Sequence, residues 1–150
     1  MQNINHLKNM IAAGAGAAGS FIVNLLGGWN EDLTTLLIFM GIDFITGLAI
    51  AGVWKKSSKS QTGALNSKSA WQGLCRKGAS LLVVLVAHRL DIATGADYIR
   101  TAVIIAFIVD EGISILENLG IMGVPMPAVL KKAIDVLKNR ADTADAKKEE

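Results

Sequence analysis

The segment Ile99–Ile121, with the sequence IRTAVIIAFIVDEGISILENLGI, constrains the chain more than any other. Its twelve Ile, Leu, Val and Phe residues each favour membrane insertion by ~0.3–0.6 kcal/mol, roughly 4–7 kcal/mol together. Asp110 and Glu111, near its middle, cost ~2.5–3.5 kcal/mol each when the value for Asp is applied to both. The two contributions nearly cancel, so this helix is not stable alone in lipid with both carboxylates ionised.

The polar side chains of this segment gather on one face of the predicted helix. At about 100° per residue, the strongly polar residues fall within an arc of about 120°, and the remaining surface is apolar or small apart from Thr101. These residues are Arg100, Asp110, Glu111, Ser114, Glu117 and Asn118. The pattern predicts a helix with one face in lipid and one against protein or water. We therefore expect these residues to line a pore or an interface between subunits.

The composition of the whole chain agrees with a membrane protein. Its 150 residues are 51% hydrophobic and 19% charged, whereas a soluble domain has about a quarter charged residues. The charges concentrate in residues 55–77 and in the last twenty residues, which argues against a soluble enzyme and a disordered chain. The net charge of +2 is too small to indicate a nucleic-acid partner. With a lone Cys75 and no ligand spacing around His6 or His88, we expect neither a metal nor a cofactor.

Four apolar blocks predict an all-α integral membrane protein with four transmembrane helices. The blocks cover about 10–26, 33–54, 78–96 and 99–121, within a transmembrane domain over residues 1–124. A span takes about 20 residues, and the third block reaches that length only by including Arg89 and Asp91, so it could also dip into the membrane without crossing. The first block also resembles a secretory signal peptide, because Lys8 precedes it and Ala15-Gly16-Ala17 resembles a cleavage site. Most of its large apolar residues, however, lie after this potential cleavage site.

Two basic segments predict the orientation of the spans. Residues 55–77 form a polar linker with six cations and no acid, and the chain after Gly120 holds six more cations. Short basic segments stay in the cytosol, so we expect both termini there. Residues 125–150 are predicted to form a cytosolic amphipathic helix, about 128–140, and a charged disordered tail.

The acids predicted to lie within the membrane need partners. They are Asp43, in the middle of the second block, and Asp110, Glu111 and Glu117 in the fourth. The predicted spans supply only Arg89 and Arg100, with His88 neutral or charged according to its surroundings. Internal ion pairs that lock a bundle are one interpretation, and a water path or subunit interface is the other. The shortage of cations favours the second.

Small residues in the first and second blocks predict close helix packing. Ala12, Gly16 and Ser20 recur every four residues, and Gly47 lies one turn after Asp43. Residues 14–19 also fit the dinucleotide fingerprint G-x-G-x-x-G letter for letter. That fingerprint requires a strand before it and alternating strands and helices after it, which this sequence lacks. A packing face is the simpler interpretation.

Several motifs together resemble one known family. They are Asp43-Phe44-Ile45-Thr46-Gly47, the segment KSAWQGLCRK at 68–77, the segment DEGISILEN at 110–118, and GVPMP at 123–127. The chain resembles the phage-lysis and toxin-secretion holin family of Gram-positive bacteria and their phages over about residues 29–140.

The resemblance implies a non-enzymatic protein of the host cytoplasmic membrane. Such a protein forms homo-oligomers in the lipid bilayer and opens lesions that release an endolysin, or in some relatives a toxin, without binding this cargo stably. Two alternatives stay open: a small ion or solute channel or transporter that uses the carboxylates within the membrane, and a passive anchor that recruits a partner through residues 128–140.

Overall fold

The computed structural model describes residues 2–55, 66–130, 132 and 136, and all regular structure in them is helical. The helices are α1 (Gln2–Leu25), α2 (Glu31–Ala49), the π-helical turn η1 (Ile50–Trp54) that continues α2, α3 (Ser67–Thr94) and α4 (Ile99–Ile121). The prediction of an all-α chain is confirmed for the described residues.

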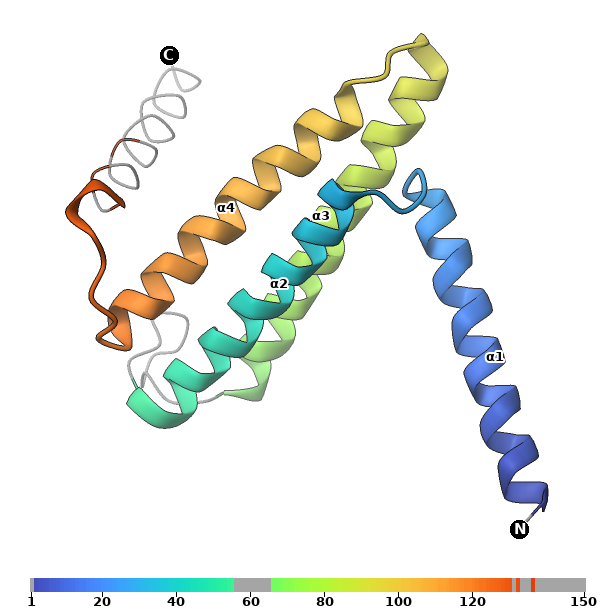
Figure 1. Ribbon diagram of the computed structural model, residues 1–150, viewed down its shortest axis with the longest axis horizontal. Helices are drawn as coiled ribbons and strands as arrows, with labels where there is room; N and C mark the ends of the chain where they lie inside the picture. The colour runs from blue at the N-terminus through green and yellow to red at the C-terminus, as the bar shows by residue number, and fades with distance from the viewer. Residues whose placement is uncertain (1, 56–65, 131, 133–135, 137–150) are drawn as a thin grey trace.

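Helices α2, α3 and α4 form a bundle, and α1 projects away from it (Figure 1). Helix α4 packs against both α2 and α3, antiparallel to α3 and parallel to α2. The apolar core lies toward the end of the bundle where α1 joins it. It consists of Leu26, Leu33, Leu36, Met40, Val84 and Ile104. Along α1 nearly every described side chain is exposed, so this helix adds little to the core.

Asparagine side chains start two of the bundle helices. The Asn30 side chain accepts a hydrogen bond from the Leu33 amide at 3.0 Å, and the Asn66 side chain accepts one from the Lys68 amide at 2.9 Å. Such caps satisfy amides that have no partner within their own helix. The second cap matters most, because it starts α3 at Ser67.

Helix α4 is capped by a residue of the preceding helix. Both carboxylate oxygens of Asp91, near the end of α3, accept backbone hydrogen bonds at 2.9 Å, one from Ile99 and one from Arg100. A carboxylate at a helix N-terminus also interacts favourably with the helix dipole. Asp91 is buried, and this bond pair explains how a carboxylate is accommodated there.

The turn between α1 and α2 is fixed to α4 by Arg100. The guanidinium donates hydrogen bonds to the carbonyl oxygens of Leu26 and Gly28. Gly27 adopts a φ of +94°, and a Cβ atom there would lie 2.8 Å from Arg100 Nε and from His88 Nδ1. Only glycine therefore fits at position 27.

The helix bounds differ from the predicted blocks at three places. The fourth block coincides with α4, but α1 starts at Gln2 and α2 at Glu31, before their predicted starts. The predicted polar linker 55–77 was wrong for residues 67–77, which form the first turns of α3. Hydropathy locates where a helix becomes apolar, whereas the Asn66 cap determines where its hydrogen bonding begins. Most of the predicted helix 128–140 and the tail lie outside the described residues.

Among the described residues, one helix is long and apolar enough by length and composition to cross a membrane, residues 31–54. Helix α4 combines a long apolar surface with Arg100, Asp110, Glu111 and Glu117. Hydropathy alone therefore supports one of the four predicted spans.

We expect replacement of Gly27 with Ala to destabilise the protein by about 1–3 kcal/mol, through a left-handed backbone conformation and a clash with Arg100 and His88. Thermal unfolding in detergent, followed by circular dichroism, measures this. Gly28 is the matched control, since its φ is +85° but no atom lies within 4 Å of an added Cβ. Equal losses for the two variants would contradict the proposed clash.

Candidate functional site

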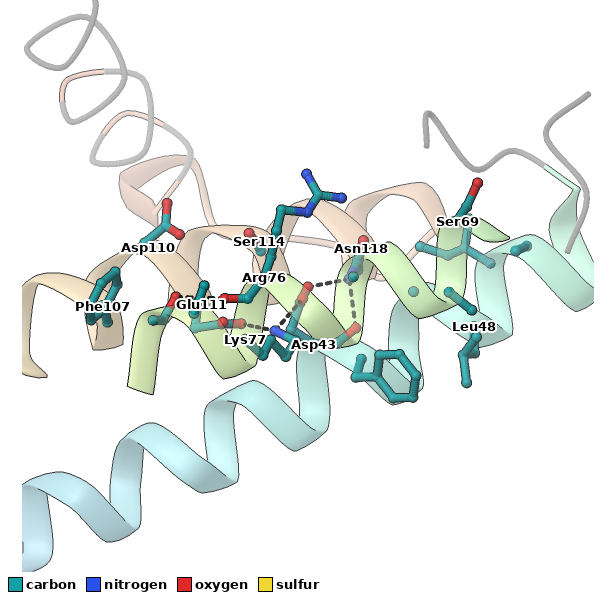
Figure 2. A pocket seen from close by; sticks show the side chains of 18 of the residues that line it. Asp43, Leu48, Ser69, Arg76, Lys77, Phe107, Asp110, Glu111, Ser114 and Asn118 are labelled. Atoms are coloured by element: carbon teal, nitrogen blue, oxygen red, sulfur yellow. Dashed lines mark hydrogen bonds and ion pairs between the residues drawn. The ribbon is translucent and has the colours of Figure 1, made fainter. Parts of the chain in front are cut away.

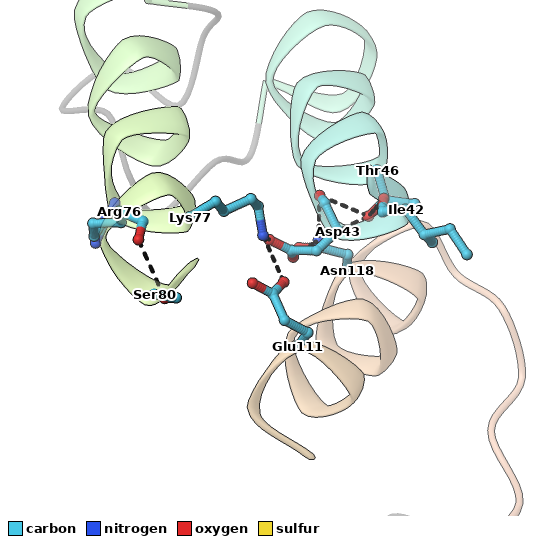
Figure 3. Close-up of polar contacts among 8 residues, drawn as sticks. All are labelled: Ile42, Asp43, Thr46, Arg76, Lys77, Ser80, Glu111 and Asn118. Carbon is cyan, nitrogen blue, oxygen red and sulfur yellow. Dashed lines mark hydrogen bonds and ion pairs between the residues drawn. The ribbon is translucent and has the colours of Figure 1, made fainter. Parts of the chain in front are cut away.

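The three bundle helices meet at a buried ion cluster (Figure 3). The Lys77 ammonium, on α3, donates to Asp43 Oδ2 on α2 at 2.9 Å and to Glu111 Oε2 on α4. One cation therefore bridges two carboxylates from two different helices. We call Asp43, Lys77, Glu111 and Asn118 the Lys77 cluster.

Asn118 completes the cluster from one side. Its amide nitrogen donates to Asp43 Oδ1 at 2.9 Å and to Thr46 Oγ1 at 2.9 Å. The Thr46 hydroxyl in turn donates to the carbonyl oxygen of Ile42 at 2.9 Å. Both carboxylate oxygens of Asp43 thus have donors, one from α3 and one from α4, so this side chain joins all three helices.

The cluster is buried and carries more acid than base. Asp43 and Glu111 are 6% and 7% exposed, and the Lys77 side chain is 14% exposed. Among the described residues, every buried side-chain nitrogen and oxygen has a hydrogen-bond partner. Removing one partner from such a buried pair costs about 3–5 kcal/mol, because the remaining charge is left uncompensated. The cluster therefore depends on all its members.

A seven-residue repeat brings these side chains together. In each bundle helix, residues seven apart point inward, as in coiled coils. The repeats are Leu36 and Asp43 on α2 with Ile50 on η1, Lys77, Val84 and Asp91 on α3, and Ile104, Glu111 and Asn118 on α4. The central charges thus occupy positions where a soluble bundle would have apolar side chains.

A cavity of about 540 Å³ lies beside the cluster, lined by all three helices (Figure 2). Its polar lining includes Asp43, Lys77, Asp110, Glu111, Ser114 and Asn118. Phe44, Leu48 and Phe107 contribute apolar walls. Charged groups and apolar walls thus lie side by side in this cavity.

The structure brings together most of the residues that the sequence analysis grouped on α4. Glu111 and Asn118 join Asp43 in the Lys77 cluster, while the exposed Asp110 and half-buried Ser114 line the cavity. Glu117 is half-buried. Gly47 also lines the cavity, and a Cβ there would lie 4.0 Å from Asn118 Nδ2.

Arg100 does not join the other polar residues of α4. It shares their angle around the helix, but it lies about 16 Å along the axis from Glu111 at 1.5 Å per residue. There it binds the turn between α1 and α2. The helical wheel gave its angle correctly and could not give its partners.

Three predicted packing residues lie on α1. Ala12, Gly16 and Ser20 are exposed, and no described atom lies within 4 Å of a Cβ added at Gly16. Their role in packing against another helix stays a prediction.

Sequence reasoning missed Lys77. It was assigned to the polar linker, so only Arg89 and Arg100 were counted as counter-ions. The missing signal was present in the sequence, because Lys77 precedes Val84 by the same seven residues that separate Asp43 from Leu36. Among the described residues, no group of three or more His, Cys, Asp and Glu residues is placed to hold a metal ion.

The fold and the site together define a class of protein: a small helical bundle with one helix apolar enough to cross a membrane and an ion cluster buried between its helices. The sequence profile of the bacteriophage holin family matches residues 20–139. The chain belongs to this family.

The chain is also similar to individual proteins, one of which is named a probable holin. A probable holin of Bacillus phage phi105 is 37% identical over 111 residues, 73% of this chain and 76% of the relative. An uncharacterised 14.9 kDa protein of Clostridium perfringens, from the region 3′ of nagH, is 36% identical over 139 residues, 91% of this chain and 99% of the relative. A Halalkalibacterium halodurans protein is 40% identical over 133 residues, 85% and 90% of the two chains. No solved structure matches.

We expect the Asn118→Ala variant to be destabilised by about 1–3 kcal/mol, because Asp43 and Thr46 each lose a buried donor. Thermal unfolding of the protein in detergent tests this. Ser114→Ala, one turn earlier on α4, is the control and should change the unfolding temperature less. If the two variants unfold alike, Asn118 does not hold the cluster together.

Proposed function

We propose that this holin inserts into the host cytoplasmic membrane with four spans and both termini in the cytosol. There it oligomerises and opens lesions through which an endolysin leaves the cell, so that its accumulation times lysis. The endolysin passes through without stable binding, and neither nucleic acid nor a cofactor takes part.

One observation carries the membrane part of this proposal: many large apolar side chains of the bundle are exposed, while the acids Asp43 and Glu111 are buried. Ile45 on α2 is 67% exposed and Leu82 on α3 is 65% exposed, while Asp43 and Glu111 are almost fully buried. Soluble proteins rarely expose large contiguous apolar surfaces. Lipid around the bundle accounts for this distribution of side chains.

Helix lengths are compatible with four crossings. The described helices have 23 to 28 residues, counting α2 and η1 together. At 1.5 Å per residue these extend roughly 35–42 Å, more than the ~30 Å hydrocarbon core of a bilayer. For α4, the Lys77 cluster lowers the cost of insertion, because Glu111 enters the membrane with a counter-ion.

The arrangement of the bundle also supports the orientation. Helices α3 and α4 are antiparallel (Figure 1), so the start of α3 and the end of α4 lie at the same end of the bundle. Lys55, Lys56 and Lys59 precede this helix pair, and six cations follow it. Positive segments tend to stay in the cytosol, which supports a cytosolic location for this end of the bundle.

The polar side of α4 is the candidate lining of the lesion. Asp110 is exposed and charged halfway along this helix, where lipid contact costs ~2.5–3.5 kcal/mol. Contact with other copies or with water removes this cost. Helix α1, exposed along its length, offers the small side chains Ala12, Gly16 and Ser20 for packing between copies.

Expression in a Gram-positive host tests the function. After a delay, we expect loss of the membrane potential and release of a cytosolic reporter enzyme, with rapid lysis when an endolysin is also produced. The potential is followed with a voltage-sensitive dye and the release by enzyme assay of the medium. Unimpaired growth with abundant protein in the membrane would exclude a holin role.

Replacing Asp110 with Asn should delay lysis, because a neutral side chain has less need of water or a second copy. The measurement is the time from induction to loss of turbidity at equal protein in the membrane. Asp97→Asn is the matched control: Asp97 is exposed in the turn between α3 and α4, outside the polar face. Unchanged timing in Asp110→Asn would remove this residue from the lining.

A small ion channel is the second candidate, and the 540 Å³ cavity with Asp43 and Glu111 in its lining favours it. Carboxylates within a membrane commonly mark ion paths. This function predicts ion flux from liposomes that contain the purified protein, with no passage of a folded enzyme. Release of the cytosolic reporter from cells distinguishes the two.

A further inference from the structure

We infer that Lys77 is the positioning residue that keeps Glu111 of α4 turned into the bundle until lysis. This inference rests on the proposed function and adds the element that regulates it. Lys77 acts through the two carboxylates that it holds.

Among the described residues, Lys77 bridges the two acids directly. Its ammonium contacts Asp43 Oδ2 and Glu111 Oε2 at once, whereas Asn118 contacts Asp43 from the other side. Without the ammonium, two buried carboxylates would face each other. Like charges in a poorly solvated interior repel strongly, so α2 and α4 would then be driven apart at this level.

The direction of the effect follows from the location of these acids. An uncompensated Glu111 on α4 can regain solvation only by meeting water or polar groups of another copy, because lipid surrounds the bundle. Rotation or separation of α4 achieves this and further exposes Ser114 and Asn118, which are half-buried on the same face. Opening therefore requires that both contacts of Lys77 break, and loss of Lys77 removes this requirement.

The magnitude is large enough to observe. Removing one partner of a buried ion pair shifts a two-state equilibrium by roughly a hundredfold or more. Opening of a lesion is a collective event of several copies, so the measurable consequence is the amount of protein in the membrane at the onset of permeabilisation. With Lys77→Met this amount should fall several-fold below that of the wild type.

Lys77→Met removes a positive charge from the basic segment 55–77 as well as the contacts with Asp43 and Glu111, and the two effects must be distinguished. Lys68, on the same helix, is exposed, and its side chain lies outside the Lys77 cluster. Lys68→Met removes the same charge from the same segment and controls for an altered orientation in the membrane. With Lys68→Met, permeabilisation should begin at the same amount of membrane-inserted protein as in the wild type.

A charge exchange tests whether the bridge itself matters. Lys77→Glu alone should also lower the amount of protein at onset. Combined with Glu111→Lys, it restores one ammonium and two carboxylates to the cluster, and the onset should return toward the wild-type amount. A side chain that served only to fill space between helices would not be rescued by a second charge change.

The experiment follows membrane-inserted protein by quantitative immunoblotting and membrane potential by a dye in the same culture. Early onset in Lys77→Met, wild-type onset in Lys68→Met and rescue by the exchange support the inference. Wild-type or later onset in Lys77→Met, or an exchange variant that accumulates without rescue, overturns it. If neither Lys77→Met nor the exchange variant accumulates, Lys77 serves folding alone and the inference also fails. A wild-type protein that accumulates without permeabilising the membrane refutes the proposed function instead.

Discussion

The Lys77 ammonium between two buried carboxylates is the interaction on which the bundle depends. Asp43, Lys77 and Glu111 come from three helices. The two acids, on α2 and α4, are buried against the ammonium that α3 supplies. Desolvation makes an isolated buried carboxylate far more costly than a paired one. The order of helices along the chain, the antiparallel turn between α3 and α4, and the length of α3 all place this one cation correctly.

At the opposite end of the bundle, Arg100 and Asp91 hold the helices together through backbone partners rather than through other charged side chains. There the charged groups bind backbone atoms: Asp91 accepts from two amides of α4, and Arg100 donates to carbonyl oxygens next to Gly27. Backbone partners do not leave when a helix rotates slightly, because the turn moves with them. The two ends therefore differ in kind, one a fixed junction and the other a set of side-chain pairs that can separate.

Much of this could be predicted from the sequence, and the failures have physical causes. The polar arc of α4 predicted a face that meets protein or water, because periodicity fixes angle, and a water path or subunit interface was favoured for the acids. The structure instead pairs Asp43 and Glu111 inside the bundle through Lys77. Lys77 was assigned to a linker because hydropathy falls where charged residues begin. The helix and its seven-residue repeat nevertheless continue through this position. Arg100 was grouped with Glu111 because a helical wheel shows the angle of a residue around the helix axis but not its position along that axis. The outward direction of α1 depends on φ values at Gly27 and Gly28, which no hydropathy pattern encodes.

A layer of Leu and Met would hold three helices together in lipid at least as well as the Lys77 cluster does, since replacing buried ion pairs with well-packed apolar residues is often neutral or stabilising. Separation of such a layer would gain no solvation free energy, because apolar side chains are similarly stable against lipid and against protein. A charged layer behaves differently: it is stable only while all its members are in place, and once parted they favour water. That asymmetry suits the proposed function, in which the protein accumulates harmlessly and then permeabilises the membrane abruptly.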